Sequence, residues 1–248
     1  MKPFLLLATR TDDVVADAEY VAFCQYGGLA PSDLVRARLE AGPLSDTVPV
    51  LDLDDWSGVI IGGGPFNASD PEDEKSDVQR RAEAEIGAVL DAALARDVPV
   101  LGACYGVGIL GTRFGGVVDK TFGEDIHAAR VTLTPEGEAD PLLAGLPRTF
   151  DAIVGHKEAC RKLPPGAVLL ATGELAPVQM FRLGRSVYAT QFHPELDVPG
   201  LVGRIKAYRH DGYFPADEVD DVVASARELT VTVPQQMLAR FVELATRR

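Results

Sequence analysis

The sequence feature that most constrains the fold is an apolar run that ends in a cysteine between two glycines. Residues 99–101 (PVL) are typical of a buried parallel strand, and Gly102 and Gly106 stand two positions before and after Cys104. This spacing is typical of a strand-to-helix turn that presents a nucleophile, where glycine lets the two backbones approach closely. The pattern therefore predicts an α/β fold in which Cys104 projects from such a turn.

That position would favour nucleophilic chemistry at Cys104. A sulfur atom at a helix N-terminus lies near backbone N–H groups and the positive end of the helix dipole, which favour thiolate over thiol. The other interpretation of the same residues is a buried cysteine in a glycine-rich turn. Because a nucleophile also needs a base, the cysteine pattern alone does not separate the two interpretations.

A candidate base lies far downstream, where a strand-like run over residues 187–192 leads into His193, Pro194 and Glu195. In an extended chain, residues two apart point to the same side. Glu195 can therefore accept the N–H of one imidazole nitrogen and leave the other nitrogen for Cys104. The alternative is a surface turn in which the histidine only caps the end of a strand.

A glycine-rich loop precedes both of these stretches. An apolar run over residues 59–61 leads into three glycines and a proline at 62–65. The backbone N–H groups of Gly64 and Tyr105 could together bind the oxyanion of a tetrahedral intermediate. Glycine-rich loops after strands also bind phosphates, but the loop that begins at residue 62 has neither the pattern G-x-x-x-x-G-K-[ST] nor G-x-G-x-x-G. The oxyanion interpretation is therefore favoured.

Together, the stretches GGGP, GACYG and QFHPE resemble, in order and character, the motifs of the class I, triad-type glutamine amidotransferases. The resemblance is to the branch that contains the glutaminase domain of GMP synthetase. It implies a doubly wound, mostly parallel α/β sheet of the flavodoxin-like kind, with extra antiparallel strands. It also implies that Cys104 is the nucleophile, His193 the general base and Glu195 the residue that orients it. Gly64 and Tyr105 would be the oxyanion donors.

One position departs from the family pattern G-x-C-x-G-x-Q. The final glutamine of that pattern, which helps to hold the substrate, is replaced by Gly108. Gly108 lies one helical turn after Cys104, so we expect a gap over the nucleophile, weak binding of free glutamine and improved turnover in Gly108→Gln. Gln191 and Phe192 complete the predicted substrate-binding set. Residues 156–158 (HKE) resemble the family's S-H-x-D stretch, with glycine in place of serine and glutamate in place of aspartate. They would either shape the pocket or a partner surface, or form a solvated turn, and we favour the turn.

Charge and cysteine content favour small-molecule chemistry in a reducing compartment. A net charge of −13 argues against nucleic acid and anionic membranes as partners. The three cysteines are widely spaced, which does not fit a disulfide framework, and no H-E-x-x-H metal-binding pattern occurs. No signal peptide and no run of about 20 apolar residues is recognised, so we expect a cytoplasmic protein without a metal or cofactor.

Hydrophobic patterns predict the order of the elements. Before the cysteine turn we expect strands at 3–9, 48–53 and 59–61 and helices at 14–26, 33–40 and 70–96. After it we expect strands, some antiparallel, at 128–133, 150–154, 168–171, 178–183 and 187–192, then helices at 201–208, 217–229 and 234–246. This order predicts an amidotransferase-like domain over residues 1–200 and a helical extension over 201–248 packed on it. The site should lie at the carboxyl ends of the parallel strands.

The expected activity is hydrolysis of the γ-amide of glutamine to glutamate and ammonia. No S-G-G-x-D-S nucleotide loop occurs in the sequence, so a synthetase that consumes the ammonia would be a separate partner chain. Two alternatives stay open. One is a stand-alone hydrolase of γ-glutamyl amides or peptides with the same triad, and the other is a catalytically silent regulatory homologue. The joint presence of the cysteine, histidine and glutamate favours an enzyme.

Overall fold

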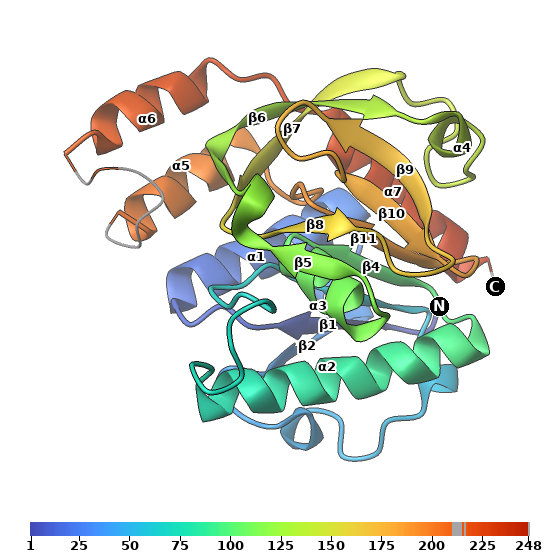
Figure 1. Cartoon of the computed structure of the whole chain (residues 1–248). Helices are drawn as coiled ribbons and strands as arrows, with labels where there is room; N and C mark the ends of the chain where they lie inside the picture. Colours follow the sequence, from blue (N-terminus) through green and yellow to red (C-terminus); the bar gives the residue numbers. More distant parts are fainter. Residues whose placement is uncertain (210–214, 216, 248) are drawn as a thin grey trace.

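The computed structural model describes residues 1–209, 215 and 217–247 (Figure 1). In this part of the chain the main sheet has nine strands in the order β2-β1-β3-β4-β11-β10-β9-β6-β7. They are β1 (Phe4–Ala8), β2 (Leu34–Arg38), β3 (Gly58–Ile61), β4 (Val100–Ala103), β6 (Glu124–Leu133), β7 (Thr149–His156), β9 (Val168–Gly173), β10 (Met180–Leu183) and β11 (Val187–Thr190). The pairs from β2 to β11 are parallel and those from β11 to β7 antiparallel. This confirms the predicted doubly wound sheet with added antiparallel strands.

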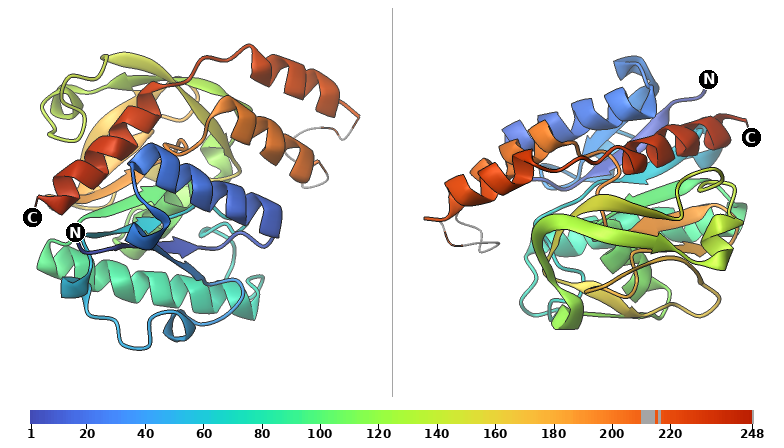
Figure 2. Two further views of the ribbon diagram at one scale, coloured as in Figure 1. Left: turned by 180° about the vertical axis from the view of Figure 1, so that it is seen from behind. Right: turned by 90° about the horizontal axis from the view of Figure 1, so that it is seen from above.

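Helices cover both faces of the parallel half of the sheet (Figure 2). One face carries α1 (Asp13–Gly27), α5 (Val198–Ala207) and α7 (Val233–Thr246), and the other carries α2 (Asp77–Arg96) and α3 (Tyr105–Arg113). Two smaller helices, α4 (Pro135–Glu138) and α6 (Val219–Arg227), lie near the antiparallel half and beside α5 respectively. None of the helices in the described ranges is both long and apolar enough to span a bilayer.

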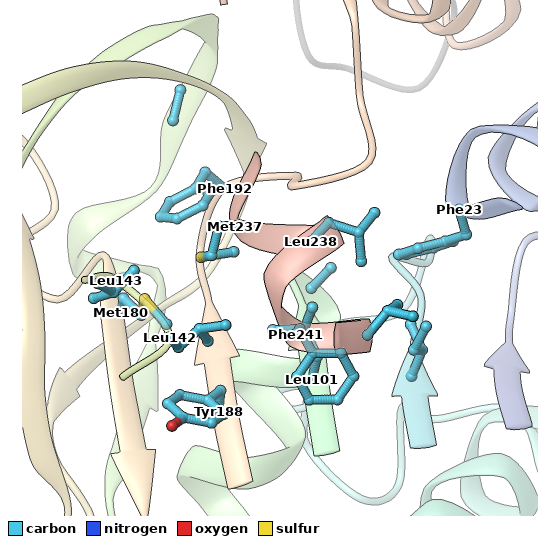
Figure 3. Packing of buried hydrophobic residues seen from close by; sticks show 14 of the residues in the cluster. Phe23, Leu101, Leu142, Leu143, Met180, Tyr188, Phe192, Met237, Leu238 and Phe241 are labelled. Carbon is cyan, nitrogen blue, oxygen red and sulfur yellow. The ribbon is translucent and has the colours of Figure 1, made fainter. Parts of the chain in front are cut away.

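Burial on both faces explains why β1 is apolar at every position. Phe4 and Leu6 belong to the hydrophobic cluster that includes residues of α1 and α7, whereas Leu5 and Leu7 belong to the cluster that includes residues of α2 and α3. In the first cluster, Phe241 of α7 lies against Phe4, with ring centroids 6.2 Å apart. Figure 3 shows the same side chain beside the sheet. The C-terminal helix is therefore part of the main core, and the expected boundary at residue 200 falls inside α5.

Three predicted elements before the cysteine are wrong. Residues 33–40 are not a helix, because Leu34–Arg38 pairs in parallel with β1 as the edge strand β2. Residues 48–53 are not a strand; Pro49 lacks the N–H that a ladder needs, and the segment ends in a single 3₁₀ turn, Leu53–Asp55. The helix predicted from residue 70 begins only at Asp77, because the Ser76 side chain accepts the N–H of Gln79 and caps it there.

Two short strands were not predicted from the sequence. β5 (Val117–Asp119) and β8 (Ala159–Lys162) pair antiparallel as a small separate sheet beside α3. Residue 156, which the sequence interpretation placed in a solvated turn, ends β7 and is buried. Its Nε2 lies 2.9 Å from Glu124 Oε2, and its Nδ1 lies 2.8 Å from the carbonyl oxygen of Glu158. His156 therefore holds the connection between β7 and β8 in place.

Candidate active site

Cys104 occupies the turn between β4 and α3. Its backbone has φ 52° and ψ −86°, a conformation that costs energy for a residue with a side chain and that is often found at functional sites. A Cβ on Gly102 would lie 3.0 Å from the Cα of Gly106, so the turn needs glycine where strand and helix pass each other. The structure thus contains the strained strand-to-helix turn that the sequence predicts.

The thiol of Cys104 is not activated by its position alone. Burial desolvates the thiolate and raises the pKa of Cys104 to about 12, although the guanidinium groups of Arg10 and Arg204 oppose this shift. The sequence interpretation expected the helix N-terminus to favour thiolate, and desolvation of the buried sulfur opposes that effect. At neutral pH the free cysteine is a thiol, so its chemistry depends on a base that removes the proton.

His193 and Glu195 lie together at the carboxyl end of β11. His193 Nδ1 lies 2.9 Å from Glu195 Oε1, and both side chains are buried. Because a carboxylate only accepts hydrogen bonds, Nδ1 carries the proton in this contact and Nε2 keeps its lone pair. Burial lowers the pKa of His193 below its usual value, so the neutral base predominates at neutral pH. Burial alone would raise the pKa of Glu195, but His193 and Arg204 hold it well below its usual range.

Arg204 of α5 adds a buried cation to this pair. Its Nη2 donates to Glu195 Oε1 at 2.7 Å, and its Nη1 lies 3.1 Å from His193 Nδ1. The same guanidinium approaches Glu19, which in turn accepts from Arg10 Nε at 2.6 Å. All five side chains are at most 8 % exposed. The network therefore alternates in charge and holds the imidazole between an anion and a cation.

Sequence reasoning missed Arg10, Glu19 and Arg204. They lie after β1, within α1 and within α5, so only the tertiary fold brings them together. One local signal existed, because Arg10 follows the carboxyl end of a buried strand, which is where doubly wound sheets place their sites. Glu19 and Arg204 have no such marker in the sequence.

Gly64 and Tyr105 present backbone N–H groups beside Cys104. A Cβ on Gly64 would overlap Thr9 Oγ1, so the loop after β3 packs against Thr9 without room for a side chain at residue 64. Tyr105 begins α3, and its N–H is one of the first-turn donors that the helix itself cannot satisfy. Within the described ranges no backbone or side-chain acceptor is recorded for either N–H. Both groups therefore stay candidates for the oxyanion donors that the sequence predicts.

The expected gap at Gly108 is filled, and the prediction of a gap is wrong. A Cβ on Gly108 would overlap Glu158 Oε1, and it would lie 3.1 Å from the Cβ of Ala68. The Glu158 carboxylate is itself anchored, because its two oxygens accept the N–H groups of Ala68 and Ser69 at 2.8 Å each. Glu158 therefore occupies the space that a side chain at 108 would enter.

The two remaining predicted substrate-binding residues have different places. Gln191 is buried beside Cys104, and its Oε1 has no hydrogen-bond partner in the described structure, so it stays a candidate for substrate contact. Phe192 is fully buried among core side chains (Figure 3). Its ring lies edge-on to that of Phe150, with ring centroids 5.9 Å apart. Its assignment to the substrate-binding set is therefore wrong, since its ring packs in the hydrophobic core.

Two hollows meet at Cys104 and Gly64. The first, which we call the histidine-side hollow, is lined by His193 and its neighbours: Arg10, Gly64, Cys104, Ile126, Ile153, Val154, Gly155, His193, Leu196, Leu201, Arg204 and Tyr208. The second, the glutamate-side hollow, is lined by Gly64, Phe66, Asn67, Cys104, Tyr105, Gly155, His156, Lys157, Glu158 and Gln191. A substrate bound across Cys104 would thus have one half in each hollow.

We expect Cys104 to be the cysteine that reacts fastest with a chloroketone analogue of glutamine. It lines both hollows with a base beside it, whereas Cys24 and Cys160 are buried and free of such a partner among the described residues. Burial raises the pKa of all three thiols, so access to the two hollows and the histidine beside Cys104 distinguish it from the others. Peptide mapping by mass spectrometry should find the adduct on Cys104, and His193→Ala should slow its formation. Equal labelling of all three cysteines would contradict the assignment.

Comparisons with known proteins find related sequences. The sequence model of the family "Glutamine amidotransferase class-I" matches residues 34–199. A subunit of the glutamine-hydrolyzing GMP synthase of Sulfolobus acidocaldarius is 30% identical over 173 residues, which are 69% of this chain and 85% of that protein. The glutamine-hydrolyzing GMP synthase of Thermosipho africanus is 29% identical over 184 residues, which are 71% of this chain. The match spans only 32% of that longer protein.

Solved structures with low sequence identity share the fold. A glutamine amidotransferase from Thermotoga maritima superimposes with a TM-score of 0.76 at 18% identity, and the match covers 100% of both chains. A putative GMP synthase subunit from Thermoplasma acidophilum superimposes with a TM-score of 0.66 at 19% identity, over 100% of this chain and 95% of that one. At these identities the likeness is evidence for the fold alone.

Proposed function

The chain belongs to the class I glutamine amidotransferase family, and on that basis we propose that it hydrolyses the γ-amide of glutamine through Cys104, His193 and Glu195. One observation carries the proposal. Cys104, at a strained strand-to-helix turn, lines the same hollow as a buried histidine whose Nδ1 is fixed by a carboxylate. A thiol and an oriented neutral imidazole beside one hollow are the parts that covalent acyl transfer needs.

In the first step His193 Nε2 takes the thiol proton while the sulfur attacks the γ-carbonyl carbon. The oxyanion that forms accepts the N–H groups of Gly64 and Tyr105. When the C–N bond breaks, His193 returns the proton to the nitrogen, and ammonia leaves a γ-glutamyl thioester on Cys104. Water then attacks the thioester with His193 as base, and glutamate is released.

Glu195 keeps Nδ1 protonated and stabilises the imidazolium that forms in each step. Arg204 limits this stabilisation, because a cation beside the ring disfavours a second positive charge. The same cation keeps Glu195 ionised, as the buried ion pair between them requires. We therefore assign Glu195 and Arg204 to positioning, and the proton transfers to His193.

The ammonia acceptor is proposed to lie on a separate synthetase chain. The relative from Sulfolobus acidocaldarius is named as one subunit of a glutamine-hydrolyzing GMP synthase, and a name of that form implies a further subunit. In the longer Thermosipho africanus protein, the match covers about a third of the sequence. These comparisons support a role in supplying ammonia. The partner chain would determine which molecule accepts it.

The experiment is an assay of ammonia release from glutamine by the purified chain, with and without a GMP synthase synthetase subunit. Wild type should release ammonia, and Cys104→Ser should lower the rate by about 10³-fold or more, because the acyl intermediate cannot form at a useful rate. Cys24→Ser, in a cysteine remote from both hollows, is the matched control and should retain the activity. Equal rates in wild type and Cys104→Ser would exclude the proposed nucleophile.

A further inference from the structure

The two hollows divide the substrate into two halves. His193 lines the histidine-side hollow and is absent from the lining of the other. Because His193 must protonate the departing nitrogen, the leaving group has to occupy the hollow that His193 faces. The γ-glutamyl half then lies toward Glu158 and Gln191. When ammonia leaves, the histidine-side hollow has to hold only one small polar molecule.

The lining of the histidine-side hollow is more elaborate than ammonia requires. Five aliphatic residues line it, from three different parts of the chain: Ile126, Ile153, Val154, Leu196 and Leu201. Ile126 and Leu201 also line the neighbouring groove between β6 and α6, together with Val222, Ala226 and Leu229. The apolar wall thus continues outward from Cys104, in the direction that a substituted amine would extend.

The ionised side chains that line the histidine-side hollow are both positive. Arg10 and Arg204 face the hollow, and no carboxylate is among the described residues that line it. Glu19 and Glu195 balance the two guanidinium groups from behind and are themselves fully buried. A ligand in this hollow therefore meets guanidinium groups directly, whereas the carboxylates that balance them lie behind. Planar guanidinium groups match a carboxylate in both charge and geometry.

The outer groove has the opposite charge. Glu218 and Asp221 of the α6 region line it beside the apolar side chains. An anionic group would be repelled there and attracted to Arg10 and Arg204, close to Cys104. An apolar group would instead find its contacts along Ile126 and Leu201. Charge and apolar lining together fix one orientation for an amphiphilic leaving group.

We propose that the histidine-side hollow is a leaving-group subsite for apolar α-amino acids, so that γ-glutamyl dipeptides with an apolar C-terminal residue are substrates. The α-carboxylate of that residue meets the guanidinium groups of Arg10 and Arg204, and its side chain lies along Ile126 and Leu201. This inference rests on the proposed cysteine-dependent hydrolysis and names a substrate class for the same site.

The reaction balances as it does for glutamine. The Cys104 sulfur attacks the γ-carbonyl carbon, and the bond from that carbon to the α-amino nitrogen of the second residue breaks. His193 transfers the former thiol proton to this nitrogen, so a free amino acid leaves. Water then hydrolyses the γ-glutamyl thioester to glutamate. No oxidant, reductant or further reactant is needed.

The test compares three substrates of the wild-type chain: γ-glutamyl-leucine, γ-glutamyl-isoamylamide and glutamine. The isoamylamide has the same branched carbon chain as the leucine compound but lacks the carboxylate. We expect kcat/KM for γ-glutamyl-leucine to exceed that for the isoamylamide by about tenfold or more, as for a charge-assisted contact. Release of leucine, isoamylamine and ammonia is measured separately.

A variant tests the apolar wall. Ile126→Trp should lower the ratio of kcat/KM for γ-glutamyl-leucine to that for glutamine by about tenfold or more, because the indole ring narrows the leaving-group hollow. Leu175→Trp is the matched control, since Leu175 is 61% exposed and lines neither hollow, and it should leave the ratio unchanged. Thermal melting of both variants shows that they fold.

The outcomes separate the two proposals. Cys104-dependent release of ammonia from glutamine, without release of leucine from γ-glutamyl-leucine, would overturn the subsite and leave the proposed function intact. An isoamylamide hydrolysed as well as γ-glutamyl-leucine would overturn the role of the arginines. If no substrate were hydrolysed, both the subsite and the proposed function would fall.

Discussion

His193→Ala is expected to lower kcat for glutamine hydrolysis by about 10³-fold or more, whereas Glu195→Gln should lower it by about 10- to 100-fold. The difference follows from the pKa of Cys104, which burial raises to about 12, so almost no thiolate exists at neutral pH without a base. Loss of the imidazole removes that base outright. Glutamine at 195 keeps the shape of the side chain and loses only the charge that orients and stabilises the ring. Steady-state ammonia release measures both effects.

The double variant distinguishes a coupled pair from two independent residues. With His193 absent, Glu195 has no ring to orient, so His193→Ala/Glu195→Gln should be about as slow as His193→Ala alone. A loss equal to the product of the two single losses would contradict a joint role. Melting curves are needed beside the kinetics, because Glu195→Gln removes the nearer of the two carboxylates beside Arg204 and leaves only Glu19, which Arg10 shares. Breaking this buried ion pair should lower the free energy of unfolding by about 3 kcal/mol.

The parts of the site that sequence reasoning recovered are those defined by local pattern. The cysteine turn needs glycine at 102, and His193 and Glu195 stand two residues apart. The short sequence of each motif is therefore enough to predict which side chains it brings together. Even there the detail differs, because β11 ends at Thr190 and the histidine and glutamate meet across a turn, not along a strand. The pairing of their side chains was predicted, and the backbone that achieves it was not.

What sequence reasoning missed depends on contacts between distant segments. Leu34–Arg38 is a strand because an edge of β1 is available to it, and local helix propensity was overridden. His156 can be buried because the carboxylate of Glu124, on another strand, forms a hydrogen bond with its imidazole ring. The net charge of the triad environment likewise depends on Arg204, a residue of the predicted C-terminal extension. Periodicity along one segment contains no information on such partners.

The position of Glu158 reverses the expectation for Gly108→Gln. This substitution should lower kcat/KM for glutamine by about tenfold, since the new side chain and the Glu158 carboxylate would compete for one buried space. Glu158 cannot move without cost, because Ala68 and Ser69 donate their N–H groups to it. Glu158→Ala alone should also be impaired, because it leaves those two N–H groups without an acceptor.

Gly108→Gln/Glu158→Ala should be more active than Gly108→Gln, by about tenfold, because the two changes compensate each other. Removing the carboxylate frees the space for the glutamine side chain, whose amide oxygen can accept the N–H groups of Ala68 and Ser69. Kinetics on glutamine and melting temperatures of the two single variants and the double variant measure the coupling. If Gly108→Gln alone improved turnover, the Glu158 side chain would have to move aside at little energetic cost. The glutamine that the family pattern has at this position would then fit beside it. If instead the losses of the single variants simply added, the two positions would not share one space.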